Sequence, residues 1–283
     1  MSDVPSETGS EAAAAGYAAR ELGEPYPRFL EYLPSEEIAA GAYLVRYARS
    51  VADLDLVQRL RFEVFNLELG EGLDSSMDTG RDHDELDPGF HHLMILSRTS
   101  GEVVGTYRMQ TASMAGAGRG FYSAGEFDLT GLPQDVLDQA IEIGRACVAK
   151  EHRNGRVLHL LWRGLALYMG WNRKRYLFGC CSLTSQEPAL GQATMEYLTV
   201  GGHLHPTLRT PPLPAIACDG AAPALVRQQA VHIPPLFQSY LNLGAKICGA
   251  PAIDRLFKTI DFLVVLDIET LYPHTLRSFF PGR

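Results

Sequence analysis

Residues 140–171 read AIEIGRACVAKEHRNGRVLHLLWRGLALYMGW, and this stretch decides the fold of the chain. Its first nine residues, 140–148, predict a strand. Its last part, 156–171, predicts an amphipathic helix, because its apolar residues recur at helical spacing. The residues on that helical face are Val157, Leu160, Leu161, Gly164, Leu165 and Tyr168. A strand that leads through a short turn into a long helix indicates an α/β protein.

Further strands and helices are expected on both sides of this unit. Ser50 is placed to cap a helix, with Asp53 near the positive end of the helix dipole. Strands are predicted at Tyr43–Ala48, His92–Ser97, Glu102–Gln110 and Tyr176–Ser182, a short helix at Pro133, and further elements at 213–218, 235–243, 246–248 and 261–267. The alternation predicts a mixed central sheet flanked by helices, with the C-terminal elements packed on the same sheet.

The chain divides into three parts by composition. Residues 1–40 are rich in Ala, Glu, Ser and Gly, so we expect a mobile arm with one short helix around Glu36–Ala40. Residues 41–200 are predicted to form the core, and 201–283 an extension of the same domain. The connection Asn66–Pro88 is long, acidic and glycine-containing, and loops of this length in compact domains are often functional.

Composition restricts the class of protein. The chain has 283 residues, of which 46% are hydrophobic, enough for a packed core. Its formal charge of -8 argues against nonspecific nucleic-acid binding, which requires many Lys and Arg on phosphates. Five cysteines without a CxxC pair indicate neither a disulfide framework nor a metal site. With no signal peptide and no long apolar run, we expect a cytoplasmic protein, at most peripheral to a membrane.

One segment is strongly basic. From Arg145 to Tyr176 there are eight Lys and Arg against one acidic residue, a balance of +7. The segment is suited to an acidic partner, although a solvated helix face would give the same pattern. Its turn Lys150–Arg156 precedes the long helix, and backbone N–H groups at a helix N-terminus bind phosphate. Basic turns before helices are also common without such a role.

Charged residues stand out where the chain is otherwise apolar or constrained. Asp84 and Asp87, if close together, would bind an ammonium group, although the following Pro and Gly also suit an ordinary turn. Arg108 lies on a core-like strand, where a charge is tolerated only when paired. On the strand 140–148, Glu142 and Arg145 face opposite sides unless a bulge at Gly144 breaks the alternation.

These charges predict a buried polar cluster at one edge of the sheet. Its acids would be Asp84, Asp87 and Glu142, and its bases Arg61, Arg108 and Arg145. Such a cluster is found both at active sites and in purely structural ion-pair networks. Charge alone leaves both interpretations open.

Several motifs together resemble one family. They are GTYR (105–108), FYSAGEFD (121–128), EIGRACV (142–148), LLWRG (160–164) and FGCCS (178–182), followed by 234–245 and 257–265. In this order they resemble the ornithine N-acyltransferases that begin ornithine-lipid synthesis, over about residues 43–270. That family is a hemolysin-like branch of the GNAT acyltransferases, similar to the acyl-homoserine-lactone synthases. The charged residues that recur in those synthases are similar in type and order to those of the predicted charge cluster.

The resemblance implies a GNAT-like fold and a reaction. A fatty acyl group, often 3-hydroxylated, would move from acyl carrier protein to the α-amine of ornithine, with no tightly bound cofactor beyond the acyl-phosphopantetheine thioester. The acidic carrier would suit the basic segment. GNAT proteins hold the donor's pyrophosphate on a glycine-rich loop, of which this chain keeps only Gly155, so acetyl-CoA is disfavoured. Peripheral contact with the inner face of the membrane is also implied.

The resemblance also implies roles for the residues. Glu142 would accept the amine's proton, backbone N–H groups near Gly144 would stabilise the oxyanion, and Arg145 would orient the carboxylates. Asp84 and Asp87 would hold ammonium groups, and Arg61 or Arg108 the substrate's carboxylate. The remaining predicted contacts are Phe65 for the substrate and Arg153, Gly155, Arg156 and Arg163 for the carrier's phosphopantetheine.

Alternatives stay open at this point. Cys147 could in principle carry the acyl group, but no His lies at a diagnostic spacing. The acceptor could be another amino acid, such as glycine or lysine, or the product a lactone signal. The chain could also be a non-catalytic module that binds acyl carrier protein or a membrane.

Overall fold

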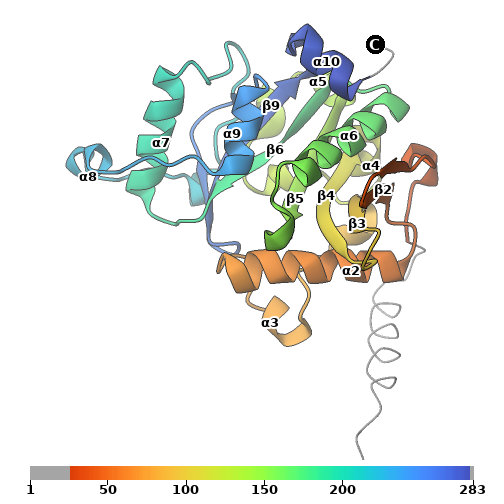
Figure 1. Cartoon of the computed structure of the whole chain (residues 1–283). Helices are drawn as coiled ribbons and strands as arrows, with labels where there is room; N and C mark the ends of the chain where they lie inside the picture. The colour runs from red at the N-terminus through yellow and green to blue at the C-terminus, as the bar shows by residue number, and fades with distance from the viewer. Residues whose placement is uncertain (1–25, 281–283) are drawn as a thin grey trace, which may run out of the picture.

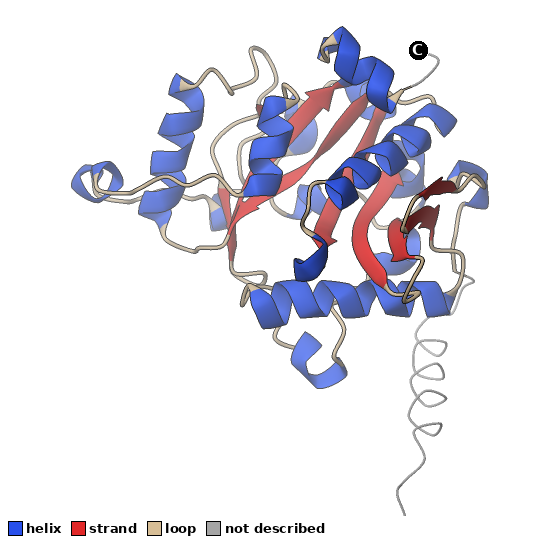
Figure 2. Ribbon diagram, viewed as in Figure 1, coloured by secondary structure: helices blue, strands red, loops and turns tan. Residues whose placement is uncertain are grey.

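The computed structural model describes residues 26–280, which build one nine-stranded mixed sheet with helices on both faces (Figures 1 and 2). The strand order is β1-β2-β3-β4-β5-β6-β9-β7, with β8 paired to β9. The strands are β1 (Ile38–Ala40), β2 (Tyr43–Tyr47), β3 (His91–Ser97), β4 (Val103–Thr111), β5 (Ala140–Val148), β6 (Tyr176–Leu183), β7 (Lys246–Ile247), β8 (Ala252–Asp254) and β9 (Thr259–Asp267). The helices are α2 (Val51–Phe62), α3 (Ser76–Thr79), α4 (Ala112–Ala117), α5 (Gln134–Asp138), α6 (Arg156–Trp171), α7 (Pro188–Val200), α8 (Pro223–Arg227), α9 (Pro235–Asn242) and α10 (Pro273–Phe279).

The unit predicted from residues 140–171 is confirmed, with β5 and α6 at the expected bounds. Helix α6 crosses one face of the sheet, in front of the strands in Figure 1. It approaches closely at Gly164, where an added Cβ would lie 2.5 Å from a methyl group of Leu93. Leu160 and Leu161 are buried there, and burying each such side chain contributes about 1.5–3 kcal/mol. Packing against the sheet therefore holds α6 in place.

The opposite face of β3, β4 and β5 is covered by α2 and by the connection that follows it. Ser50 caps α2 as expected, because its Oγ accepts a hydrogen bond from the backbone N–H of Asp53. The helix runs on into a π-helical segment, Glu63–Glu68, which carries Phe65. Arg61 is buried on the side of α2 that faces the sheet. This face of the sheet carries the polar residues described below.

The N-terminal prediction needs correction where the structure describes it. Residues 1–25 of the predicted arm lie outside the described residues, but 26–40 are packed against the domain. Tyr26 is buried and hydrogen-bonds His92, with 2.9 Å between its hydroxyl oxygen and Nδ1. The short helix expected around Glu36–Ala40 is instead β1, which pairs with β2. Pairing with a neighbouring strand outweighs the helix-forming residues of this segment.

Strands from the C-terminal part join the same sheet, as expected. β9 pairs antiparallel with β6 along its length, from Tyr176 opposite Asp267 to Leu183 opposite Ile260. Helix α7 has no counterpart among the predicted elements. All of its buried residues except Leu198 are small, namely Ala189, Gly191, Ala193 and Thr194, so the helix shows no strong apolar periodicity in the sequence.

The centre of the sheet opens between β5 and β6. These strands pair in parallel only from Ala140–Tyr176 to Glu142–Phe178. Gly179 permits a close approach at the last pair, since an added Cβ would lie 2.0 Å from the carbonyl oxygen of Ile143. Beyond it the two strands separate, and the second half of β5 has no strand partner on that side within the described part of the chain.

Candidate active site

Strand β5 carries a bulge beside this opening. Gly144 pairs with Arg108 of β4 and Cys147 with Thr106, so Arg145 and Ala146 together oppose one residue. Arg145 has a left-handed φ of 48°, which costs a non-glycine residue about 1–3 kcal/mol and is typical of functional sites. The bulge was expected at Gly144 and lies one residue later. It brings Arg145 to the face that also carries Arg108, where both contact Asp84.

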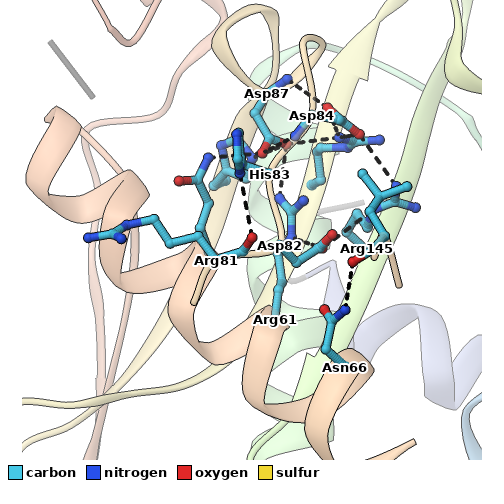
Figure 3. Close-up of polar contacts among 12 residues, drawn as sticks. Arg61, Asn66, Arg81, Asp82, His83, Asp84, Asp87 and Arg145 are labelled. Atoms are coloured by element: carbon cyan, nitrogen blue, oxygen red, sulfur yellow. Dashed lines mark hydrogen bonds and ion pairs between the residues drawn. The ribbon is translucent and has the colours of Figure 1, made fainter. Parts of the chain in front are cut away.

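Six charged residues meet on this face. We call them the Arg–Asp cluster, and they are Arg61, Arg108, Arg145, Asp82, Asp84 and Asp87 (Figure 3). Arg61 lies between two aspartates, with Nε 2.7 Å from Asp82 and Nη1 2.9 Å from Asp87. Three arginines thus face three aspartates.

The remaining contacts complete the cluster around Arg108. Its Nη1 lies 2.6 Å from Asp84 Oδ2 and 2.8 Å from Asp87 Oδ1. Arg145 is looser, with Nη2 3.4 Å from Asp84 and Nε 3.6 Å from Asp82. Its guanidinium lies 3.8 Å from the ring centre of Phe257, which packs edge-on against Phe65. The predicted substrate contact Phe65 is buried and reaches the cluster through Phe257.

Charge pairing lowers the pKa values of Asp84 and Asp87. Burial alone would raise the pKa of Asp87, but Arg61, the imidazole of His92 with Nε2 3.5 Å from Asp87 Oδ1, and Arg108 together hold that pKa well below its usual range. Burial likewise opposes ionisation of Asp84, and Arg108 outweighs it, so the pKa of Asp84 is lowered. Carboxylates in this condition are poor bases.

The predicted cluster is confirmed for five of its six members and wrong for the sixth. Asp84, Asp87, Arg61, Arg108 and Arg145 come together, but on the face of the central strands rather than at an edge. Asp82 was missed, because nothing in a run of alternating acids marks which one points inward. The oxygens of Asp84 and Asp87 are taken by arginines, which argues against their predicted binding of ammonium groups.

Glu142 lies apart from the arginines. Its carboxylate accepts hydrogen bonds from Gln110 Nε2 at 2.7 Å and from the backbone N–H groups of Tyr122 at 3.0 Å and Ser123 at 2.7 Å. The predicted pairing with arginine is therefore wrong. The loop 121–126 supplies the donors that satisfy this buried charge, and a loop contact of this kind is not readable from sequence spacing. Glu142 fixes that loop over the sheet.

A second group of acids lies beyond that loop. We call Glu126, Asp254 and Asp261 the acid cluster; Cys180 of β6 lies against it. The ligand atoms of Glu126, Cys180 and Asp261 lie within 4.8 Å of one another, a set that could hold a metal ion. The hydroxyl of Tyr122 lies 3.3 Å from Asp254 and 3.4 Å from Arg145 Nη1, so it connects the two clusters.

The acid cluster has no basic partner. Within residues 26–280, no Lys, Arg or His forms an ion pair with Glu126, Asp254 or Asp261. Burial, reinforced by Asp261, raises the pKa of Glu126 to about 10. Burial also raises the pKa of Asp261 and, well above its ordinary value, that of the Cys180 thiol. The sequence did contain a signal, since Asp261 interrupts an apolar strand as Arg108 does.

The predicted carrier-binding residues lie at α6, but they differ in exposure and in how many ion pairs and hydrogen bonds their side chains make. Arg153 is engaged by Glu68, with Nη1–Oε1 and Nη2–Oε2 distances of 2.5 and 2.7 Å, and donates to the carbonyl of Val148. Gly155 begins the helix with a φ of 75°, and Arg156 beside it is exposed. Arg163 is half-buried about two helical turns further on.

The charges of the basic segment are divided along α6. Lys150, Arg153 and Arg156 lie at one end of this helix, whereas Arg173, Lys174 and Arg175 lie at the other, about 24 Å away for 16 residues. At the far end, Arg175 pairs with Asp267 and Glu269. The +7 balance therefore does not form one continuous surface.

Cys147 is unsuited to covalent catalysis in this structure. It is buried, and burial raises the pKa of its thiol, which disfavours the nucleophilic thiolate. Its backbone pairs with Thr106 inside the sheet. Direct attack on a thioester needs no such nucleophile.

Known proteins resemble this chain in sequence. The family model described as an acetyltransferase (GNAT) domain matches residues 60–163, which contain β3, β4, β5 and the start of α6. An L-ornithine N(alpha)-acyltransferase of Agrobacterium fabrum is 31% identical over 247 residues, 82% of this chain and 83% of the relative. The enzyme of that name from Rhodobacter capsulatus is 32% identical and covered to 96%.

The chain belongs to the L-ornithine N-alpha-acyltransferase family. It is an acyltransferase with a GNAT-like mixed sheet flanked by helices. Among solved structures, the AHL synthase LasI aligns with 85% of this chain and 95% of its own, at 14% identity and a TM-score of 0.45. No helix of residues 26–280 is long and apolar enough to cross a membrane.

Proposed function

We propose that this acyltransferase moves a 3-hydroxy fatty acyl group from acyl carrier protein to the α-amine of ornithine, giving lyso-ornithine lipid. The observation that carries the proposal is the opening between β5 and β6 beside the bulge at Arg145. An added Cβ at Gly144 would meet nothing within 4 Å, so there is room next to the backbone. The names of the relatives supply the acceptor.

The proposed reaction is direct aminolysis. The neutral α-amine attacks the thioester carbon, a C–N bond forms, and the C–S bond breaks to release the carrier thiol, which takes up a proton. Bringing the two substrates together in the opening supplies much of the rate. Backbone N–H groups near Gly144 stabilise the oxyanion, because donors fixed by the sheet need no reorganisation.

The amine's proton goes to Glu142, which is the acid of β5 and forms no ion pair within the described residues. Its oxygens already accept three hydrogen bonds, so taking a proton requires one donor to give way. The assignment is testable by the turnover rate. A carboxylate that only holds the loop would leave kcat near wild type when it is replaced by an amide.

Arg145 is the arginine best suited to the substrate's carboxylate. Arg61 and Arg108 are enclosed by aspartates, with side chains 0% and 2% exposed. Arg145 is 9% exposed and makes the longest ion pairs of the cluster, at 3.4 and 3.6 Å. We therefore transfer the predicted carboxylate contact from Arg61 or Arg108 to Arg145.

The donor would approach from the N-terminal end of α6. Lys150 and Arg156 are exposed there, next to the helix N-terminus at Gly155, which suits the phosphate of a phosphopantetheine arm. An acidic carrier protein would be attracted to the same end of the helix. The amphiphilic product would be released at the inner face of the membrane. The enzyme would be cytoplasmic and would associate with that face peripherally.

The test is a product assay with the purified full-length chain. It is incubated with acyl carrier protein charged with a 3-hydroxy fatty acid, or with the matching acyl-CoA, and single amino acids, and N-acyl products are identified by mass. We expect N-acylornithine from the carrier-bound donor. Product from acyl-CoA alone would overturn the donor, product with glycine but not ornithine would overturn the acceptor, and no product would overturn the reaction.

A further inference from the structure

The acid cluster is not explained by the reaction centre described so far. Glu126 follows the turn 122–125, Asp254 ends β8, and Asp261 lies on β9, opposite Ser182 of β6. Asp261 faces the same side of the sheet as its neighbour Thr259, whose hydroxyl lies 3.2 Å from it. Three separate segments thus deliver acids to one place beside the opening between β5 and β6.

The acid cluster contains buried oxygens that no basic side chain reaches. Glu126 is 6% and Asp261 2% exposed, and no N–H group of the described residues donates to Glu126 Oε1 or Asp261 Oδ1. The two carboxyl groups instead hydrogen-bond each other through the proton that Glu126 keeps, because the pKa of Glu126 is raised to about 10. This acid–carboxylate pair holds a negative charge without a cation among the described residues. Such a pair suits a ligand that brings N–H donors and positive charge.

The neighbouring groups give the cluster a definite position. Cys180 Sγ lies 3.7 Å from Glu126 Oε2 and 3.8 Å from the hydroxyl of Ser123. The backbone N–H of Ser123 binds Glu142, the proposed proton acceptor. Cys180 lies two residues beyond the last residue of β6 that pairs with β5, where the strands have begun to separate. The acids are thus linked, through Cys180 and Ser123, to the reacting end of β5.

We propose that Glu126 and Asp261, with Asp254 beside them, bind the second ammonium group of a diamino acid acceptor while its α-amine attacks the thioester. This inference rests on the proposed function, because it takes the acceptor to be ornithine. An ammonium group offers three donors and one positive charge, which match two buried oxygens without an N–H donor and the excess of acids. The acids thereby select a diamino acid over an amino acid with a neutral side chain.

A divalent metal ion is the competing occupant, since two carboxylates and a thiol lie close enough to share one. An ammonium group is favoured because the acceptor of the relatives already carries it. The acid cluster also has no arginine to balance it within the described residues, because the neighbouring arginines pair with Asp82, Asp84 and Asp87. The experiment below separates the two occupants.

The test compares ornithine with norvaline, which is ornithine without the δ-amine. For the wild-type chain we expect kcat/KM to favour ornithine by about 100-fold or more, as for sites built around a buried polar contact. Glu126→Gln and Asp261→Asn should each reduce this preference below about 10-fold by raising KM for ornithine. Turnover of norvaline and the KM of the acyl donor should stay near wild type, which shows that each variant is folded.

The control is Glu85→Gln, which removes an acid that is 71% exposed and pairs with Arg119. It should keep the wild-type preference. A wild-type enzyme that acylates ornithine and norvaline equally would overturn the ammonium site and leave the proposed acyl transfer standing. Failure to acylate ornithine would overturn the proposed function itself. Loss of the preference on treatment with EDTA, and its return with Zn²⁺, would overturn the ammonium site in favour of a metal ion.

Discussion

The Arg–Asp cluster and the acid cluster lie on the same face of one sheet but are neutralised in opposite ways. In the first, Asp84 and Asp87 keep lowered pKa values beside arginines. In the second, Glu126 and Asp261 have raised pKa values and no cation within the described residues. A closed set of ion pairs holds segments together, whereas buried acids without a partner weaken the fold. We infer that buried carboxylates without a basic partner mark a ligand site, whereas paired ones stabilise the fold.

The largest expected effect on stability comes from breaking the Arg–Asp cluster. Arg108→Met leaves Asp84 and Asp87 without their shared partner, so the free energy of unfolding should fall by about 3–5 kcal/mol in urea denaturation. The exposed pair Arg119–Glu85 provides the control, and Arg119→Met should cost at most about 1 kcal/mol. Equal losses of stability from the two changes would show that the buried Arg–Asp cluster stabilises the fold no more than an exposed ion pair does.

Glu142 lies between the two clusters and should show an intermediate effect. Glu142→Gln places an amide N–H against the backbone donors of Tyr122 and Ser123, which should cost about 1–3 kcal/mol in stability. Because Glu142 is the proposed proton acceptor, the change should also lower kcat, by about 10²–10⁴-fold for a general base. Gln110→Ala is the matched control, because it removes one donor and keeps the carboxylate. If both variants change stability alike and leave kcat near wild type, Glu142 only holds the loop.

The acid cluster should limit stability at alkaline pH. The folded chain keeps a proton on Glu126 up to pH values near 10, whereas the unfolded chain releases it near 4.5, so stability falls as pH rises between these values. The slope from one such group is at most about 1.4 kcal/mol per pH unit. In denaturation experiments from pH 6 to 9, Glu126→Gln should flatten this slope. An unchanged slope would mean that Glu126 is not held protonated.

The smallest expected effect concerns the contact between the clusters. Tyr122→Phe removes a hydroxyl that lies near both Arg145 and Asp254, and should cost about 0.5–1.5 kcal/mol. With Arg145 less well oriented, KM for ornithine should rise while kcat changes little. Steady-state kinetics check this, with Tyr197→Phe as control, since Tyr197 is 52% exposed. A lower kcat with unchanged KM would assign the hydroxyl to the chemistry instead.

Local patterns were sufficient for the framework and insufficient for the site. The strand 140–148 and the helix 156–171 were predictable because apolar spacing and tertiary packing agree there. Helix α7 was not, since small buried residues give little periodicity. The β1 strand was mistaken for a helix because its partner β2 decides its conformation.

Charges were predictable as buried groups but not as pairs. Arg108 and Asp84 could be expected to need partners because strands and long loops rarely bury charge without them. Which acid meets which arginine depends on the bulge at Arg145 and on the path of the loop, which spacing does not give. The same reasoning applied to Asp261 would have indicated the acid cluster, and the family motif at 121–128 already contained Glu126.

The most direct test of the contrast between the clusters is the number of protons released when ornithine binds, measured by calorimetry at pH 7 in buffers of different ionisation enthalpy. An arriving ammonium should displace the proton held by Glu126 and Asp261. We predict that the wild-type chain releases about one proton more than Glu126→Gln does. Equal proton release from both proteins would contradict the claim that the acid cluster binds the ammonium group of ornithine.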